Sequence, residues 1–147
     1  MQIKSLGHVV VRVKNLARAE RFYADVLGLP VCAHFNEQGM NMAFFSLGNH
    51  HDFAIAEVSG EGSATNPQTA VGLDHVAFNI GTTLDELREA KTKLEAAGIQ
   101  PDPVDHEVTQ SLYFTDPDGN GIELYVDTSD VWKHEPQRVA QVAPLTL

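Results

Sequence analysis

The chain has 147 residues, one cysteine and a formal net charge of −10, from 10 basic and 20 acidic residues. This length suits one domain with its own core, and so acidic a chain is not expected to bind nucleic acid or an anionic membrane surface. No apolar run reaches the roughly 18 residues of a spanning helix, and neither a signal-peptide pattern nor a second cysteine is found. We therefore expect a cytoplasmic protein without a disulfide or a Cys-rich zinc site.

The first module is expected over residues 4–58 and opens with a strand whose residues alternate between two faces. The apolar face, which should pack on the core, carries Val9, Val11 and Val13. His8 belongs to the other face. A helix over residues 16–27 should follow, with Asn15 as its N-cap and Gly28 ending it.

The second module, residues 73–127, repeats the start of the first. The match is between Leu6-Gly7-His8-Val9-Val10 and Leu73-Asp74-His75-Val76-Ala77. His75 therefore occupies the same strand position as His8, and it too lies opposite an apolar face. Thr83 and Glu86 form a predicted capping box for the next helix, which Gly98 ends.

The remaining pattern completes a single domain of the α+β class. Further strands are predicted near residues 42–47, 52–58, 110–115 and 121–126. The small polar residues of 59–72 suit a linker between the modules. The tail, residues 128–147, is interpreted either as a cap on the domain or as a contact in a homodimer.

Two histidines and one carboxylate are the candidate metal ligands. His8 and His75 stand at equivalent positions of the repeat, where pairing of the modules would let them converge. Glu123 alternates with Ile122 and Leu124, so its carboxylate leaves the core face, where burial would be costly without a cation. Two histidines and one carboxylate, all on strands, are the ingredients of an open facial metal site.

These residues, in this order and spacing, resemble those of the vicinal-oxygen-chelate superfamily, which includes glyoxalase, bleomycin-resistance and extradiol-dioxygenase proteins. The chain is most similar to a one-domain type I extradiol catechol dioxygenase. The resemblance implies two paired βαβββ modules that form a cupped mixed sheet around a metal site. It also implies that His8, His75 and Glu123 bind Fe(II), with Mn, Ni and Zn as alternatives.

Other stretches resemble catechol dioxygenases and imply catalytic residues. His51-Asp52-Phe53-Ala54 resembles their His-Asp-x-Ala segment, whose histidine is an acid–base residue outside the metal ligands. Leu112-Tyr113-Phe114-Thr115-Asp116-Pro117 resembles their tyrosine-bearing strand. His51, expected at the mouth of its strand, and Tyr113 are thus the catalytic candidates, with His106 as a further candidate. The residues interpreted as surface histidines are His34, His50 and His134, and Cys32 is interpreted as a small core residue.

The function that the resemblance implies is metal-dependent ring cleavage of a catechol-like small molecule by O2, as in aromatic degradation. His51 would serve as general acid or base, and Tyr113 would donate a hydrogen bond to the bound substrate. One alternative is a glyoxalase-type isomerase, lyase or epimerase with Glu57 as a fourth metal ligand. The other is a non-catalytic protein that binds a small molecule such as a drug.

Overall fold

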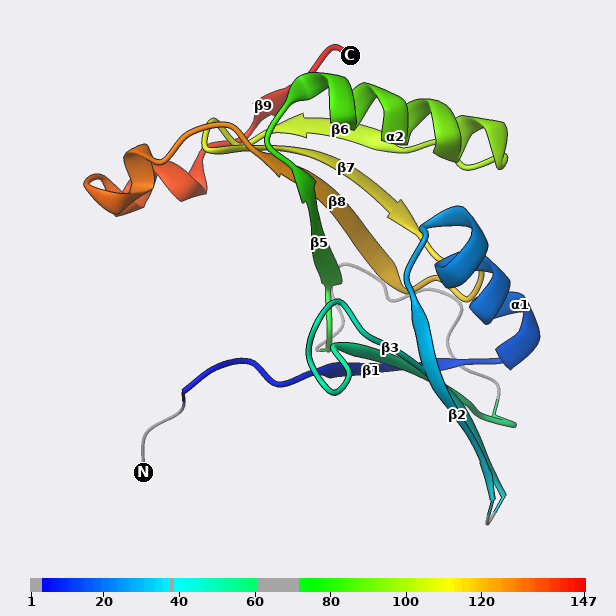
Figure 1. Ribbon diagram of the computed structural model, residues 1–147. Coiled ribbons are helices and arrows are strands. Elements are labelled where there is room, and N and C mark those ends of the chain that lie inside the picture. The colour runs from blue at the N-terminus through cyan, green and yellow to red at the C-terminus, as the bar shows by residue number, and fades with distance from the viewer. Residues whose placement is uncertain (1–3, 38, 61–71) are drawn as a thin grey trace. The chain divides into compact units, whose positions relative to one another are not determined.

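The computed structural model describes residues 4–37, 39–60 and 72–147 (Figure 1). The chain divides into two compact units, residues 1–65 and 66–147. Each unit has one mixed sheet and helical segments, which confirms the predicted α+β class. Most of the predicted linker, residues 59–72, lies outside the described residues. Within the described residues, no helix has the length and apolar character needed to span a membrane.

The first unit has the strand–helix–strand–strand–strand order expected of one module. Its elements are β1 (Val9–Val13), α1 (Leu16–Arg21), the π-helix η1 (Phe22–Val26), β2 (Val31–Glu37), β3 (Met40–Phe45) and β4 (Phe53–Glu57). The sheet order is β1-β4-β3-β2, in which β1 runs parallel to β4 and the other neighbours are antiparallel. Because β1 and β4 are parallel, both strands begin at the same end of the sheet, and the residues that precede them lie close together there.

The predicted helix over residues 16–27 is present as α1 followed directly by η1. The first N–H groups of a helix lack partners within it, and here the Asn15 side chain accepts a hydrogen bond from the Arg18 N–H at 2.8 Å. Gly28 follows the helical segment with a φ of 80°, a left-handed conformation that glycine adopts without steric cost. The predicted cap and stop are both confirmed.

The core of the first unit lies between the apolar face of its sheet and the helical segment. Val11 and Val13 are buried as the alternation predicts, whereas Val10 on the other face is 44% exposed. The Tyr23 ring of η1 lies 4.7 Å from the Phe53 ring, measured between centroids. This contact packs η1 against the start of β4.

The second unit repeats the same element order and adds a C-terminal segment. Its elements are β5 (His75–Gly81), α2 (Leu84–Ala96), β6 (Asp102–Asp105), β7 (Thr109–Thr115), β8 (Gly121–Asp127), the 3₁₀ helices η2 (Val131–Lys133) and η3 (Pro136–Ala140), and β9 (Ala143–Pro144). The sheet order is β5-β8-β7-β6-β9, with β5 parallel to β8. Helix α2 lies along this sheet and buries Leu87 and Leu94 (Figure 1).

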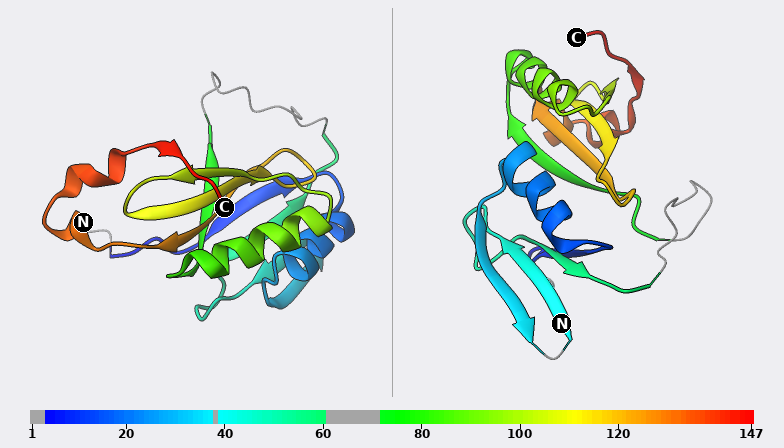
Figure 2. Two further views of the ribbon diagram at one scale, coloured as in Figure 1. Left: turned by 90° about the horizontal axis from the view of Figure 1, so that it is seen from above. Right: turned by 90° about the vertical axis from the view of Figure 1, so that its right-hand side faces the viewer.

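Three strands, β2, β6 and β9, are additional to those located by hydrophobic alternation. β2 is an edge strand whose side chains are mostly exposed, and it pairs with β3 in the hairpin seen in Figure 2. β6 contains Pro103, a residue that argues against a strand from sequence. Cys32 was expected to be a small core residue, and this expectation is wrong. Cys32 lies on the edge strand β2, where its thiol is exposed.

Gly121 allows the start of β8 to approach β5 closely, because glycine has no side chain. Gly121 begins β8 directly beside His75, where a Cβ would lie 2.2 Å from the backbone carbonyl oxygen of Asp74. The preceding turn is held by the Asp116 carboxylate, whose Oδ1 accepts hydrogen bonds from two backbone N–H groups at 2.8 Å each. The turn and the glycine together set the register in which β5 and β8 pair.

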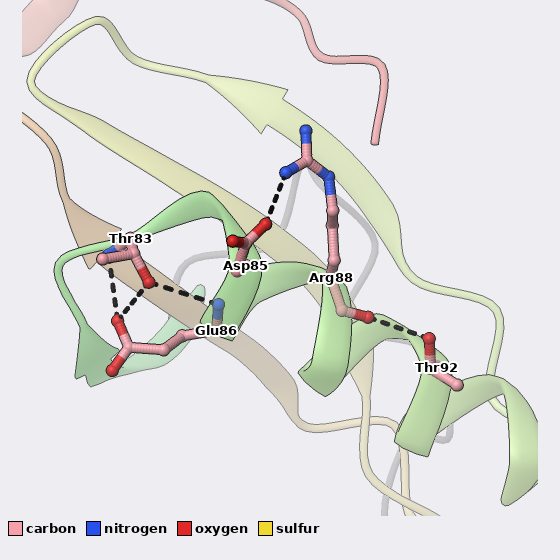
Figure 3. A network of polar contacts seen from close by, with 5 residues as sticks. All are labelled: Thr83, Asp85, Glu86, Arg88 and Thr92. Atoms are coloured by element: carbon pink, nitrogen blue, oxygen red, sulfur yellow. Dashed lines mark hydrogen bonds and ion pairs between the residues drawn. The ribbon is translucent and has the colours of Figure 1, made fainter.

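The N-terminus of α2 carries the predicted capping box, shown in Figure 3. The Glu86 N–H donates to Thr83 Oγ1 at 3.3 Å, and Glu86 Oε2 accepts from the Thr83 N–H at 2.9 Å. The Thr83 hydroxyl, followed by the N–H groups of Thr82 and Thr83, holds the pKa of Glu86 below its ordinary value. The carboxylate reaches back past Gly81, where a Cβ would lie 2.2 Å from it.

The capping box gives a test of local stability. Thr83→Ala is expected to lower the free energy of unfolding by about 1 kcal/mol, because the first turn of α2 loses its side-chain acceptor. Urea denaturation measures the change. Thr92→Ala is the matched control, since the Thr92 hydroxyl only bonds the Arg88 carbonyl within the same helix (Figure 3). Equal losses in the two variants would show that the cap contributes nothing.

Candidate functional site

His75 and Glu123 face each other on the second sheet. His75 opens β5 beside Gly121, and Glu123 lies two residues further along β8, so the two side chains share one face. His75 Nε2 is 3.1 Å from Glu123 Oε2. Glu123 is 7% exposed, and its other oxygen accepts a hydrogen bond from the Ser111 hydroxyl at 2.6 Å. Two of the three predicted ligand residues are therefore in contact.

Asp74 constrains where His75 carries its hydrogen. His75 Nδ1 lies 2.7 Å from Asp74 Oδ2, and because a carboxylate can only accept, Nδ1 is the protonated nitrogen. In the neutral ring Nε2 then presents a lone pair to the Glu123 carboxylate. Two lone pairs at this distance repel each other unless a proton or a metal ion lies between them. Sequence reasoning missed Asp74, although its place next to His75 was the available signal.

The donor atoms suit a divalent first-row metal. Two ligand atoms about 2.0–2.2 Å from one ion and about 90° apart are about 3 Å from each other, which matches the separation of Nε2 and Oε2. Imidazole and carboxylate together suit iron, manganese and zinc. The hydrogen bond from His75 to Asp74 also orients the ring in the way that carboxylate partners orient metal-binding histidines.

Tyr113 lies beside Glu123, on β7, and its hydroxyl contacts His106. His106 Nδ1 is 2.9 Å from the Gln141 carbonyl oxygen, so Nδ1 carries the hydrogen, and Nε2 lies 3.0 Å from the Tyr113 hydroxyl. The Tyr113 hydroxyl also bonds the side chains of Glu123 and Ser111. Burial, and after it the charge of Glu123, raises the pKa of Tyr113 to about 12. The hydroxyl therefore stays protonated at neutral pH, and His106 stands next to it.

The first unit carries a cluster of three histidines, His8, His50 and His51. One ring nitrogen of each lies within 4.8 Å of the others. The His51 ring is 4.2 Å from that of His8 and 4.6 Å from that of His50, measured between centroids. The cluster follows from the parallel pairing of β1 and β4, since Val9 pairs with Phe53 and the residues that precede them meet at one edge.

His51 precedes the first residue of β4, which agrees with its expected place at the mouth of the strand. Burial, followed by the neighbouring His8 and His50, lowers the pKa of His51, which favours a neutral ring able to accept a proton. His50 was expected to lack neighbours; it is exposed, but its ring packs against His51. The signal for it was the His-His pair ahead of a strand. His34 and His134 are exposed as expected.

Glu57, the candidate fourth ligand of the isomerase alternative, lies at the end of β4 away from the edge that carries His8. Its two oxygens accept hydrogen bonds from the Leu16 N–H and from the Asn41 side chain, each at 2.9 Å. The Asn41 bond, and after it the Leu16 bond, lowers the pKa of Glu57. This carboxylate secures the start of α1, at the end of β4 away from His8, and its assignment as a fourth metal ligand stays a prediction.

The strand registers identify the residue of the first unit that corresponds to Glu123. Glu123 pairs with the residue two positions after His75. In the first unit, Val10 stands two positions after His8, and Val10 pairs with Ala54. An alanine methyl group cannot bind a metal ion, so the first unit offers no carboxylate at this position.

A cleft of ≈ 430 Å³ lies within the second unit, beside Glu123. This volume falls in the range of roughly 300–1,000 Å³ that is usual for small-molecule sites. The residues that matter for its chemistry are His106, Tyr113 and Glu123 on the polar side and Val108, Trp132 and Val139 on the apolar side. The cleft thus gathers three of the predicted site residues around a space of suitable size.

Comparison with solved structures supports the fold. A glyoxylase/bleomycin resistance protein/dioxygenase domain from Frankia sp. EAN1pec has a TM-score of 0.73, with 91% of this chain and 99% of that chain covered. The two sequences are 21% identical, so this likeness concerns the fold alone.

Three curated relatives differ in their named activities. Biphenyl-2,3-diol 1,2-dioxygenase 3 of Rhodococcus globerulus is 38% identical over 83% of this chain and 63% of its own length. Catechol-2,3-dioxygenase of Bacillus subtilis is 30% identical over 83% of this chain and 41% of its own length. A probable lactoylglutathione lyase of Synechocystis sp. is 27% identical over 84% of this chain and 96% of its own. The chain therefore spans about two-fifths to three-fifths of the dioxygenases it matches.

The family comparison covers most of the chain. The model of the Glyoxalase/Bleomycin resistance protein/Dioxygenase superfamily matches residues 5–124, a segment that includes His8, His75 and Glu123. Together with the repeated strand–helix–strand–strand–strand order, this match decides the assignment. The chain belongs to the glyoxalase/bleomycin resistance protein/dioxygenase superfamily.

Proposed function

We propose that the chain is a metal-dependent extradiol-type dioxygenase that cleaves the ring of a catecholic substrate with O2. The observation that carries this proposal is the facing of His75 Nε2 and Glu123 Oε2 next to a cleft of small-molecule size, because that arrangement suits a metal ion held between the two atoms. Similarity to proteins named as biphenyl-diol and catechol dioxygenases supports the choice of reaction.

His8, His75 and Glu123 are the proposed protein ligands, and Fe(II) is the proposed metal, with Mn, Ni and Zn as alternatives. The three side chains would supply two imidazoles and one carboxylate, the set that non-haem iron oxygenases use. When bound, the metal would supply Lewis acidity and open coordination positions for two vicinal substrate oxygens. Ala54, in the position that corresponds to Glu123, favours three protein ligands over four.

His51 and Tyr113 are the proposed acid–base and positioning residues. The lowered pKa of His51 leaves its ring neutral, so it can accept a proton from a substrate hydroxyl. Tyr113, whose hydroxyl contacts His106 and Glu123, would donate a hydrogen bond to the bound substrate, as the resemblance implies.

A glyoxalase-type lyase or isomerase is the second candidate, because the similarity to a probable lactoylglutathione lyase covers 96% of that protein. Such a site would need a fourth protein ligand. Both oxygens of Glu57 are engaged near α1, and Ala54 has no donor atom. A non-catalytic binding protein would have no need for the facing pair of His75 and Glu123. These contacts favour the dioxygenase.

The ligand assignment is tested by metal content. His75→Ala is expected to abolish stoichiometric metal binding, because it removes the imidazole that faces Glu123, and His8→Ala and Glu123→Ala should behave alike. Metal analysis after anaerobic loading with Fe(II), with circular dichroism to verify folding, gives the result. His34→Ala, which removes an exposed histidine paired with Glu20, is the control and should bind like the unmodified protein. Full occupancy in His75→Ala would exclude it as a ligand.

Glu57 separates the two candidate reactions. Glu57→Gln should leave metal content and ring-cleaving activity close to those of the unmodified protein, since the amide oxygen can still accept the Leu16 hydrogen bond. The measurements are metal analysis and oxygen uptake with a panel of catechols. A loss of metal as large as that of Glu123→Ala would instead support a four-ligand lyase or isomerase.

The proposed role of His51 predicts a loss of rate without a loss of binding. His51→Phe should lower turnover by about 10² to 10⁴, the usual contribution of general acid–base catalysis, while metal content and catechol affinity stay near normal. Steady-state oxygen uptake and anaerobic catechol titration separate the two effects. His50→Phe, a change at the adjacent ring of the same cluster, is the control and should turn over normally. Normal turnover by His51→Phe would remove its catalytic role.

A further inference from the structure

The floor of the cleft runs from Glu123 at one end to Asp127 at the other, which we call the distal end. Along β8 the residues on its floor are Glu123, Tyr125 and Asp127, which share one face because they alternate along the strand. Tyr113 pairs with Glu123 at one end, and Thr109 pairs with Asp127 at the other. At about 3.3 Å per residue, the two ends are about 13 Å apart. The floor is therefore longer than one aromatic ring.

The distal wall comes from the C-terminal segment. Trp132 of η2 and Val139 of η3 line the cleft, and they stand 44% and 56% exposed. The segment that carries them is attached to the sheet by pairing of β9 with β6, by the ion pair between Arg138 and Glu107, and by the contact of His106 with the Gln141 carbonyl. Both wall residues lie beyond residue 124, where the family match ends. Family membership therefore does not determine this wall.

The carboxylates that line the cleft lie at its two ends. Among the described residues that line it, none is a lysine or an arginine, whereas Glu123 and Asp127 carry carboxylates. Asp127 is held in place by a hydrogen bond from the Asn79 side chain at 2.7 Å. A second carboxylate brought to the distal end would meet the like charge of Asp127 there.

Two cations stand next to the wall, and each is paired with a carboxylate. Lys133 Nζ lies 5.8 Å from the centre of the Trp132 ring and pairs with Asp130, and Arg138 pairs with Glu107.

We infer that the cleft selects catechols with an uncharged apolar substituent and rejects those whose substituent carries a carboxylate. The ring hydroxyls would lie at the end with Glu123, as the proposed function requires, and this inference rests on that function. The substituent would then extend over Tyr125 toward Trp132 and Val139, with Asp127 as the residue that excludes anions. Trp132 and Asp127 are the specificity-determining residues.

Binding can be followed without turnover, because Trp132 is the only tryptophan of the chain and its fluorescence reports occupation of the distal end. The iron-loaded protein is titrated without oxygen with three probes: catechol, catechol carrying an ethyl group, and catechol carrying a carboxymethyl group. The ethyl compound should bind most tightly. The carboxymethyl compound should bind at least about fivefold more weakly than the ethyl compound.

Two substitutions, each with a matched control, assign the effect to residues. Asp127→Asn should restore most of the affinity for the carboxymethyl compound, whereas Asp102→Asn, the same charge change at a residue of β6 that does not line the cleft, should not. By calorimetry, Trp132→Ala should weaken the ethyl compound and spare unsubstituted catechol. Val142→Ala, at a residue that is 73% exposed and outside the cleft, should alter neither.

The outcomes separate this inference from the proposed reaction. Equal affinities for the ethyl and carboxymethyl compounds, or equal effects of Asp127→Asn and Asp102→Asn, would overturn the inferred selectivity even if oxygen uptake proves the protein a dioxygenase. The expected preference without any oxygen uptake would support the selectivity and overturn the reaction. Failure of all three probes to bind would overturn both.

Discussion

The second unit depends on one contact, the approach of the His75 ring to a buried carboxylate. Glu123 is almost fully buried, and an ionised group in such a place is costly unless hydrogen bonds and a cation compensate for lost water. Ser111 supplies one hydrogen bond, and His75 stands where the cation is required. Everything that fixes β5 beside β8 serves this contact. A register shift of one residue would turn Glu123 to the opposite face of the sheet.

Each unit contains a parallel strand pair, but the side chains where these strands begin differ between the two units. In the second unit the parallel strand pair places a histidine beside a carboxylate. In the first unit the equivalent pair places a histidine beside two more histidines, and an alanine stands where the carboxylate would be. Duplication of one module thus supplies the framework, while the side chains at its strand ends make the two halves chemically unlike. In the proposed metal site, that asymmetry would leave three protein ligands rather than four, and so more open coordination positions.

Much of the fold could be predicted from local patterns. The caps at Asn15 and Thr83, the stop at Gly28 and the repeated first strands depend on short-range geometry that sequence expresses directly. Strands at a sheet edge could not be found in the same way, since most side chains of β2 are exposed. The contacts of Glu57 were not predicted either, because its partners, Leu16 and Asn41, are remote in sequence and become visible only when the sheet is built.

The contact between His106 and the backbone of Gln141 has a consequence for how the chain can vary. It joins residues 35 positions apart, and through it a main-chain oxygen fixes the orientation of the His106 ring beside the Tyr113 hydroxyl. Any amino acid at position 141 would present the same oxygen, so the contact places no demand on the side chain there. What it does demand is that the tail return to the sheet at the right length. Insertions and deletions between β8 and β9 would therefore disturb the hydrogen bonds of His106 and Tyr113 more than substitutions at 141.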